Sequence, residues 1–365
     1  FPTRPGVPAV GSRSGQFVKG LNDMTTIFLT HSPQTLENYY SKRALDQLRE
    51  CATVKLNTSR HLLQVDELVE AAQGCQIIVS SRETAAPAQL FEQLPGLAAF
   101  CRVAVDIRNI DVAAASAHGV LVTRATPGFD TSVSEWVMGV MIDLSRGISR
   151  AAASYWQGKI PAVTMGRELR GSTLGIVGYG FIGRKLATMA RAFDMNVLVC
   201  DPFVSAHEPG IRQASFEEVT AASDYVVCLA PATAETANLF GRRAFQTMQP
   251  HAFFINASRG ELVDEQALVA ALDQKVIAGC ALDVGRAEDQ MPTPAIAAHP
   301  KVIANPHIGG LTPEASEHQA MDTVRQVQAL LGGKVPADAV NLEHASRASR
   351  LFGVRSNPSV ELSHE

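Results

Sequence analysis

The regular alternation of short apolar runs with longer stretches of helical period limits what this chain can fold into more than any other feature. The first runs are rich in β-branched residues and lie at 26–29, 53–56, 77–79, 98–103 and 120–122. Stretches with helical spacing lie between them, at 34–50, 64–72 and 112–118. Because parallel strands need crossover connections of about this length, the pattern predicts an α/β domain with a parallel sheet.

A second alternating set follows a long helical segment that we expect at 132–153. Its apolar runs lie at 173–177, 196–200, 225–229, 253–256, 278–283 and 302–304. Six strands with intervening helices predict a doubly wound, Rossmann-type sheet. A last helix is expected after Thr312 and Pro313, which supply an N-cap and a first-turn proline, and we expect this helix to pack on the first domain.

This pattern divides the chain into four parts. We expect a flexible N-terminal extension at 1–23 and a polar, mobile C-terminal tail at 341–365. Residues 24–126 and 308–340 would form a smaller α/β domain that is discontinuous in sequence. Residues 127–307 would form the doubly wound domain.

Composition excludes several classes of partner. The net charge of −4 gives no basic surface for nucleic acid or an anionic membrane, so a small-molecule partner is favoured. No stretch of about 20 apolar residues is present for a membrane span. The six cysteines are dispersed without CxxC spacing, which is typical of reduced thiols in a cytoplasmic protein and predicts no metal site.

A glycine-rich turn follows the first strand of the second set. Gly178, Gly180 and Gly183 form a GxGxxG pattern between a strand and a helix, where helix amides can bind a diphosphate. Asp201 ends the next strand, where a carboxylate can accept hydrogen bonds from both ribose hydroxyls and repel a 2′-phosphate. The pattern therefore predicts NAD rather than NADP, although Asp201 could also serve only as a turn residue before Pro202.

Three polar residues at the ends of later strands suit the reduction of a keto acid. Arg259 supplies a cation for a carboxylate and a carbonyl, and His307 supplies an acid for the developing alkoxide. Glu288 could fold back onto the imidazole and fix its tautomer. Asp283 could meet the nicotinamide amide. Each also has a structural interpretation: Arg259 as a surface turn, Asp283 as a helix cap and His307 as part of a hinge.

In order and spacing, these segments resemble the D-isomer-specific 2-hydroxyacid dehydrogenase family. The likeness extends from about residue 24 to residue 333 and includes residues 109–111, 132–135 and 262–264. It implies a flavodoxin-like substrate domain, formed by 24–126 and 308–340, joined to an NAD-binding domain at 127–307. It also implies a homodimer that transfers a hydride between NAD(H) and a D-2-hydroxy acid or 2-keto acid.

The resemblance assigns roles to individual residues. It implies that Arg259 binds substrate, His307 donates the proton and Glu288 pairs with His307. Residues implied to bind or line the cofactor are Gly178, Gly180, Phe181, Ile182, Gly183, Asp201, Pro231, Thr236, Ala257, Asp283 and Gly310. Residues implied to lie near the substrate are Ser81, Arg82, Val105 and Asp106, with backbone amides at Val105 and Asp106 holding its carboxylate.

The sequence departs from the family pattern at several positions. Asp106 places a negative charge beside the expected carboxylate site. Gly285 stands where an aromatic residue is usual, and Asp289 is an alternative partner for His307. Trp136 replaces a more typical histidine and belongs either to the core or to the border of the nicotinamide.

Two other functions are open to a chain of this kind. An NAD(H)-sensing, corepressor-like protein would bind the dinucleotide without useful turnover, but it would need none of Arg259, Glu288 and His307. A formate dehydrogenase would need a glutamine where Asn305 precedes Pro306. We expect an enzyme, with its particular 2-hydroxy acid and its physiological direction left open.

Overall fold

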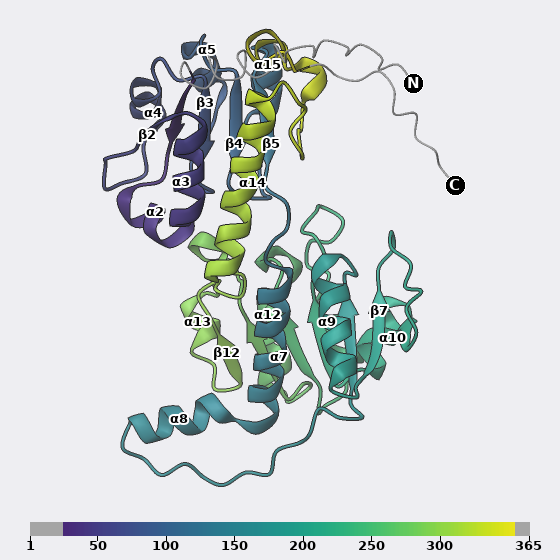
Figure 1. The fold of residues 1–365 in the computed structure, drawn as a ribbon. Helices are drawn as coiled ribbons and strands as arrows, with labels where there is room; N and C mark the ends of the chain where they lie inside the picture. Colours follow the sequence, from purple (N-terminus) through teal and green to yellow (C-terminus); the bar gives the residue numbers. More distant parts are fainter. Residues whose placement is uncertain (1–24, 355–365) are drawn as a thin grey trace, which may run out of the picture. The chain divides into compact units, whose positions relative to one another are not determined.

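Two compact units make up the chain in a computed structural model that describes residues 25–354 (Figure 1). The first unit, hereafter unit 1, comprises the described residues up to Gly128 and from Pro313 onward, and unit 2 comprises Phe129–Thr312. The expected boundaries at 126/127 and 307/308 therefore differ from the observed ones by two and five residues. The expected extension at 1–23 lies outside the described residues. No helix among residues 25–354 is long and apolar enough to cross a membrane.

Unit 1 is built on a five-stranded parallel sheet in the order β2-β1-β3-β4-β5, which is the flavodoxin-like order. Its strands are β1 (Thr26–Leu29), β2 (Thr53–Leu56), β3 (Ile77–Ser80), β4 (Ala99–Arg102) and β5 (Leu121–Arg124). Its helices are α2 (Pro33–Tyr39), α3 (Lys42–Cys51), α4 (Val65–Ala71), α5 (Ala88–Gln93), α6 (Val112–Ala117), α14 (Pro313–Leu331) and α15 (Ser346–Phe352), with a 3-10 turn η3 (Leu342–His344).

Helices cover both faces of this sheet because neighbouring residues along each strand point to opposite sides. Ile27, Val79 and Cys101 pack with α3 and α14, whereas Phe28 and Phe100 pack with α4 and α5. Helix α14, which the sequence predicted to pack on the first domain, lies against α3 in this unit (Figure 1).

The segment after Asn341 is not a separate tail within the described residues. Helix α15 ends at Phe352, and Ala348, Phe352 and Val354 are buried in the same core as α14. Asn341 is buried too, and its side chain accepts the Val122 amide at 2.8 Å. Few apolar residues occur here, but they are spaced on one face of a short helix, which is how the segment reaches the core.

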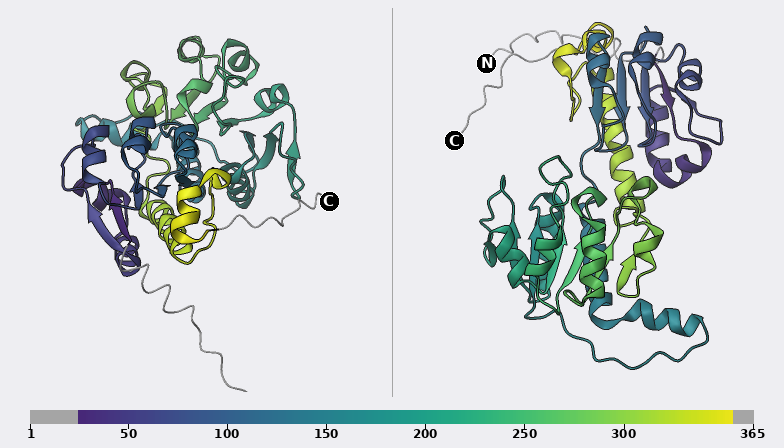
Figure 2. Two further views of the ribbon diagram at one scale, coloured as in Figure 1. Left: turned by 90° about the horizontal axis from the view of Figure 1, so that it is seen from above. Right: turned by 180° about the vertical axis from the view of Figure 1, so that it is seen from behind.

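Unit 2 is built on a seven-stranded parallel sheet in the order β12-β11-β10-β9-β6-β7-β8, with helices on both faces (Figure 2). Its strands are β6 (Thr173–Val177), β7 (Asn196–Cys200), β8 (Ile211–Gln213), β9 (Tyr225–Cys228), β10 (Phe253–Asn256), β11 (Gly279–Leu282) and β12 (Val302–Ala304). Its helices are α7 (Asp130–Arg146), α8 (Ile148–Trp156), α9 (Phe181–Ala192), α10 (Phe216–Ala222), α11 (Arg242–Thr247), α12 (Glu265–Asp273) and α13 (Pro294–Ala297), with 3-10 turns η1 (Gly260–Leu262) and η2 (Glu288–Gln290).

The strand order of unit 2 reverses beside β6. The chain passes from β6 outward to β7 and β8, then returns to β9 on the other side of β6. Ligands of doubly wound sheets bind at such a reversal, outside the carboxyl ends of the strands. The fold therefore directs attention to the loops after β6, β7, β9, β10, β11 and β12.

Helix α5 was not expected from the sequence, and two of the expected helical segments are each divided into two helices. The segment expected at 132–153 is two helices, because Gly147 adopts a left-handed φ of +66° and ends α7. The stretch expected at 34–50 is also two helices, separated at Tyr40 and Ser41, where the Ser41 side chain caps α3.

Candidate active site and cofactor site

The glycine turn after β6 is formed as the sequence pattern requires. Gly178 has a φ of +102°, and a Cβ atom there would lie 2.5 Å from the Ala230 nitrogen. A Cβ atom at Gly183 would lie 2.5 Å from the Gly178 carbonyl oxygen, so α9 packs directly on the turn. At Gly180 no heavy atom lies within 4 Å of the Cβ position. The backbone is therefore open at this glycine, where a diphosphate would approach.

Helix α9 begins at Phe181, directly after the open glycine. Its N-cap, Gly180, has an extended backbone and offers no capping side chain. The first amides of a helix have no acceptor within the helix and bind anions readily. The turn and this helix start therefore fit a dinucleotide diphosphate, with Phe181 and Ile182 in the first turn.

Asp201, the residue directly after β7, binds the glycine turn. Its Oδ2 accepts the Tyr179 amide at 2.7 Å, and its Oδ1 accepts the amides of Phe203 and Val204 at 2.9 and 3.0 Å. The carboxylate thus organises both its own turn and the one at Gly178. Each carboxylate oxygen can accept more than one hydrogen bond, so Asp201 could still accept hydrogen bonds from the ribose hydroxyls. That role stays a prediction.

The loop after β9 borders the same edge of the sheet. The Thr236 hydroxyl donates to the Pro231 carbonyl at 2.7 Å and accepts the Thr233 amide at 2.8 Å. These bonds close the loop on itself. Ala257 follows β10, the neighbouring strand, and its amide donates to the Cys228 carbonyl at 3.3 Å. Their assignment to the cofactor stays a prediction.

Arg259 follows β10 in a tightly bonded turn. Its Nη1 donates to the Ser258 carbonyl at 2.7 Å, and the Asn256 side chain donates to the Arg259 carbonyl at 2.9 Å. The next residue, Gly260, lies so close to Gly285 that a Cβ atom would be 2.0 Å from its carbonyl oxygen. The two loops after β10 and β11 are therefore packed together. This packing fixes the backbone position from which the half-buried Arg259 side chain extends.

Gly285 has a steric reason for departing from the family pattern. A Cβ atom there would lie 2.4 Å from the Pro292 Cα and 2.7 Å from the Met291 carbonyl oxygen. An aromatic side chain has no room. The Gly285 amide donates to the Gln290 carbonyl at 2.6 Å, which closes the loop that contains Glu288.

Glu288 is exposed at the start of η2. The Asp289 side chain lies outside the described part of the chain. Glu288 therefore stays the predicted partner of His307, and Asp289 stays the alternative.

His307 follows β12, and its backbone is held by Asp283 at the end of β11. The His307 amide donates to the Asp283 carbonyl at 2.9 Å. The Asp283 carboxylate is buried and accepts the amides of Ile308 and Gly309, each at 2.8 Å. Burial raises the pKa of Asp283, while these amides and the nearby His307 act in the opposite direction. Gly310 packs against Phe129, since a Cβ atom there would lie 3.3 Å from the Phe129 Cβ.

The predicted substrate residues of unit 1 lie on two loops at the carboxyl edge of its sheet. Ser81 is buried and its hydroxyl bonds to that of Thr84 at 2.9 Å, whereas Arg82 is exposed. Val105 and Asp106 are half-buried in the loop after β4. Arg108 pairs with Asp106 through Nη2 and Oδ2 at 2.7 Å. The negative charge of Asp106, beside the predicted site for the substrate carboxylate, therefore has a cation next to it.

Arg102 organises these loops, although it was not predicted from the sequence. Its side chain is fully buried and donates to the carbonyls of Ser81, Arg82 and Thr84 and to the Asn109 side chain. Burial lowers its pKa to about 10, which still leaves it charged at neutral pH. A lone cation inside the apolar run 98–103 was the available signal, because such a charge is retained only where acceptors surround it.

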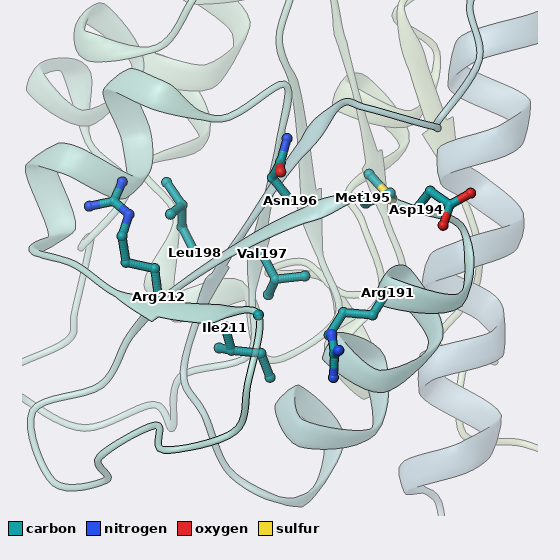
Figure 3. Close-up of a pocket in the computed structure, with 9 residues that line it drawn as sticks. Arg191, Asp194, Met195, Asn196, Val197, Leu198, Ile211 and Arg212 are labelled. Atoms are coloured by element: carbon teal, nitrogen blue, oxygen red, sulfur yellow. The ribbon is translucent and has the colours of Figure 1, made fainter.

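A separate cavity of about 560 Å³ lies at the opposite end of β7 (Figure 3). Its lining comes from the end of α9, the start of β7 and the start of β8, including Arg191, Asn196 and Arg212. None of the predicted site residues lines it. Arg212 is paired with Glu218, so its charge is already balanced.

A parallel doubly wound sheet with an open glycine turn, a carboxylate after the next strand and polar loops at one edge defines a dinucleotide-binding protein. Residues 138–309 match the family model described as "D-isomer specific 2-hydroxyacid dehydrogenase, NAD binding domain". The chain belongs to the D-isomer specific 2-hydroxyacid dehydrogenase family, and its cofactor is NAD.

Curated relatives support the same assignment. D-3-phosphoglycerate dehydrogenase of Archaeoglobus fulgidus is 33% identical over 309 residues, which cover 83% of this chain and 58% of that protein. The Bacillus subtilis enzyme of the same name is 36% identical over 260 residues, which cover 69% of this chain and 49% of that protein. The alignments thus span only about half to three fifths of these relatives' own lengths.

Solved structures agree in fold. The TT0316 protein of Thermus thermophilus is 28% identical with a TM-score of 0.77, and the match covers 87% of this chain and 100% of that chain. D-lactate dehydrogenase of Escherichia coli is 25% identical with a TM-score of 0.75, and covers the same shares. The alignments with these solved structures therefore extend over both units of this chain.

Proposed function

We propose that this chain is a dehydrogenase that transfers a hydride between NAD(H) and a D-2-hydroxy acid or 2-keto acid pair. The observation that carries the proposal is that Arg259 and His307 follow β10 and β12, two strands whose carboxyl ends lie at the same sheet edge as the glycine turn. A guanidinium and an imidazole at that edge are the two groups that keto acid reduction requires.

Each residue has a defined part in this reaction. The Arg259 guanidinium binds the substrate carboxylate and polarises the carbonyl. The His307 imidazolium gives its proton to the alkoxide oxygen as the carbonyl is reduced, and Glu288 stabilises the imidazolium beforehand. The nicotinamide of bound NADH supplies the hydride for the carbonyl carbon. In the reverse direction His307 removes the proton from the hydroxyl.

The loops of unit 1 complete the proposal. Ser81, Arg82, Val105 and Asp106 are proposed to contact the substrate, with the Val105 and Asp106 amides as donors to its carboxylate. The support is local to this unit: Arg102 fixes the loop at Ser81 and Arg82, and Arg108 balances the charge of Asp106. A carboxylate can then approach without meeting an unpaired negative charge.

Replacing Arg259 with alanine tests the proposal. We expect kcat/KM for the best 2-keto acid to fall by about 100-fold or more, because a charge-assisted contact to the reacting group is lost, while NADH binding stays nearly unchanged. The assay follows NADH oxidation against a panel of 2-keto acids that includes glyoxylate, hydroxypyruvate and 3-phosphohydroxypyruvate. The last compound is chosen because the curated relatives are D-3-phosphoglycerate dehydrogenases.

Arg243→Ala is the matched control, since Arg243 lies in the same unit and its side chain is 88% exposed. It should leave both turnover and NADH binding unchanged. Equal turnover in Arg259→Ala and the native chain would refute the role of Arg259. NADH binding without turnover of any acid would instead favour the sensing, corepressor-like alternative.

We further propose that the protein is a cytoplasmic homodimer. The support for a partner lies in α8 and the loop after it, where large apolar side chains are exposed. They are Tyr155, Trp156, Ile160, Val163 and Met165, and Trp156 and Ile160 are 85% and 89% exposed. Apolar groups gathered in this way mark an interaction surface. All six cysteines are free thiols in the structure, which suits a reducing compartment.

A further inference from the structure

The loop from Asn305 to Gly309 holds its histidine in an unusual backbone conformation. His307 has a φ of +55°, in the left-handed region that side-chain-bearing residues rarely adopt. Such a conformation persists only where the surrounding structure imposes it. The residues that contact the loop therefore determine the backbone position from which the His307 imidazole extends.

Asp283 supplies one set of these contacts. Its carbonyl and both carboxylate oxygens accept three successive amides, those of His307, Ile308 and Gly309. A Cβ atom at Gly309 would lie 2.8 Å from the Asp283 Oδ2, so only glycine allows this approach. Asp283 is 3% exposed, and hydrogen bonds to a buried carboxylate of this kind are strong.

Trp136, on α7, supplies a second and independent set. Its indole Nε1 donates to the Asn305 Oδ1 at 3.0 Å, at the beginning of the loop. Its ring also borders the far end, because the Trp136 Cδ2 lies 3.5 Å from the Cβ position of Gly309. The indole thus bonds the loop before His307 and borders it after His307, and Asp283 bonds the amides of His307, Ile308 and Gly309.

We propose that Trp136 is a positioning residue for His307: its indole fixes both ends of the loop and so keeps the imidazole in the left-handed backbone geometry. This inference rests on the proposed function, because it concerns the group that we propose as proton donor. An indole has one N–H donor and no acceptor, so Trp136 itself takes no part in proton transfer.

Trp136→Phe in the full chain tests this role, because phenylalanine keeps an aromatic ring beside Gly309 and removes only the N–H donor. We expect hydrogen exchange at the Ile308 and Gly309 amides, measured without cofactor, to become about tenfold faster as the loop loosens. We also expect kcat to fall by about tenfold and its pH profile to shift, with KM for NADH unchanged. Active sites are counted by NADH binding, which separates altered sites from unfolded chains.

Two further variants sharpen the test. Phe193→Leu changes an aromatic side chain that is 44% exposed at the end of α9, outside the proposed dimer surface, and should leave the Ile308 and Gly309 amides unaffected. Asn305→Ala removes the acceptor of the same bond. If one bond is responsible, Asn305→Ala and Trp136→Phe should accelerate exchange equally, and the double variant should be no faster.

The outcomes separate the two levels of the proposal. Unchanged amide exchange and an unchanged pH profile in Trp136→Phe would overturn the positioning role, even in an active dehydrogenase. Faster exchange with a lower number of NADH sites and a native kcat per site would also overturn it, because Trp136 would then serve only stability. If the native chain reduced no keto acid, the proposed function would be refuted, and faster exchange in Trp136→Phe would still establish the loop contacts.

Discussion

At the scale of single residues, His31 is a buried base beside a buried cation. It lies 2% exposed in unit 1, its ring 5.2 Å from that of Tyr40, and its Nδ1 atom has no hydrogen-bond partner in the described part of the chain. Burial, together with the charge of Arg102, lowers the pKa of His31 to about 3. The imidazole is therefore neutral in the folded protein across the whole range in which enzymes are usually assayed.

This pKa predicts a stability that falls with acidification. An unfolded chain protonates the same histidine below about pH 6.5, so between pH 6.5 and 3 the unfolded state binds the extra proton and is stabilised relative to the folded state. Moving from pH 7 to pH 5 should cost about 2 kcal/mol of unfolding free energy through His31 alone. His31→Phe, which keeps a ring beside Tyr40, should remove that part of the loss in urea unfolding measured at both pH values.

His61→Gln is the control, because His61 is exposed and pairs with Glu67 at the surface. It should keep the full pH dependence of the native chain. An identical loss of stability in native protein and His31→Phe would show that other groups, and not this imidazole, cause the acid sensitivity.

At the scale of elements, the two glycines Gly183 and Gly180 in the strand, turn and helix of residues 173–192 have different predicted roles. Gly183 serves packing, and Gly180 serves cofactor binding. Gly183→Ala places a methyl group 2.5 Å from the Gly178 carbonyl oxygen, so α9 must move away from the turn. We expect a loss of about 1–3 kcal/mol in stability without cofactor and weaker NADH binding. Gly180→Ala meets no protein atom within 4 Å and should lose NADH affinity alone, because only the diphosphate approaches there.

Thermal unfolding without NADH and fluorescence titration with NADH distinguish the two variants. An equal fall in unfolding temperature for Gly180→Ala and Gly183→Ala would contradict the claim that a methyl group at Gly180 meets no protein atom. If Gly180→Ala bound NADH as well as the native chain, the diphosphate would lie elsewhere.

Most elements could be predicted from the sequence because central strands such as β3, β4 and β9 are buried on both faces and therefore read as continuous apolar runs. Strand β8 (Ile211–Gln213) was missed, since an edge strand with one apolar residue has no such signal. The end of α7 was also missed. Helical period continues past Gly147, and only the left-handed φ there, which sequence spacing does not encode, separates α7 from α8.

The candidate site divides in the same way. Arg259, His307 and the glycine turn were predictable because they directly follow strands, where local sequence reports position. The bond from Trp136 to Asn305 joins residues 169 positions apart, and Arg102 reaches carbonyl acceptors 18 to 21 positions away. No local pattern records such pairs, so they required coordinates.

At the scale of the whole molecule, the exposed apolar side chains of α8 and the following loop predict self-association. Trp156→Glu with Ile160→Glu should convert the proposed dimer to a monomer, because two charges would have to be buried in an apolar interface. Sedimentation velocity over a range of protein concentrations measures the change. Phe203→Glu is the control, since Phe203 is 91% exposed in the same unit but far along the chain from α8.

A native chain that sediments as a monomer at micromolar concentration would contradict the dimer. A dimer that survives both glutamates would place the interface on another surface.

The discontinuity of unit 1 has a consequence for synthesis on the ribosome. Its core needs Val324, Val327 and Leu330 from α14 and Phe352 from α15, which are translated only after all of unit 2. The first five strands, which have already been translated, therefore wait with one apolar face incompletely covered while unit 2 is translated and folds. The nascent amino-terminal half is then the form of this protein that most needs a chaperone, because α14 and α15 complete its core only when translation ends.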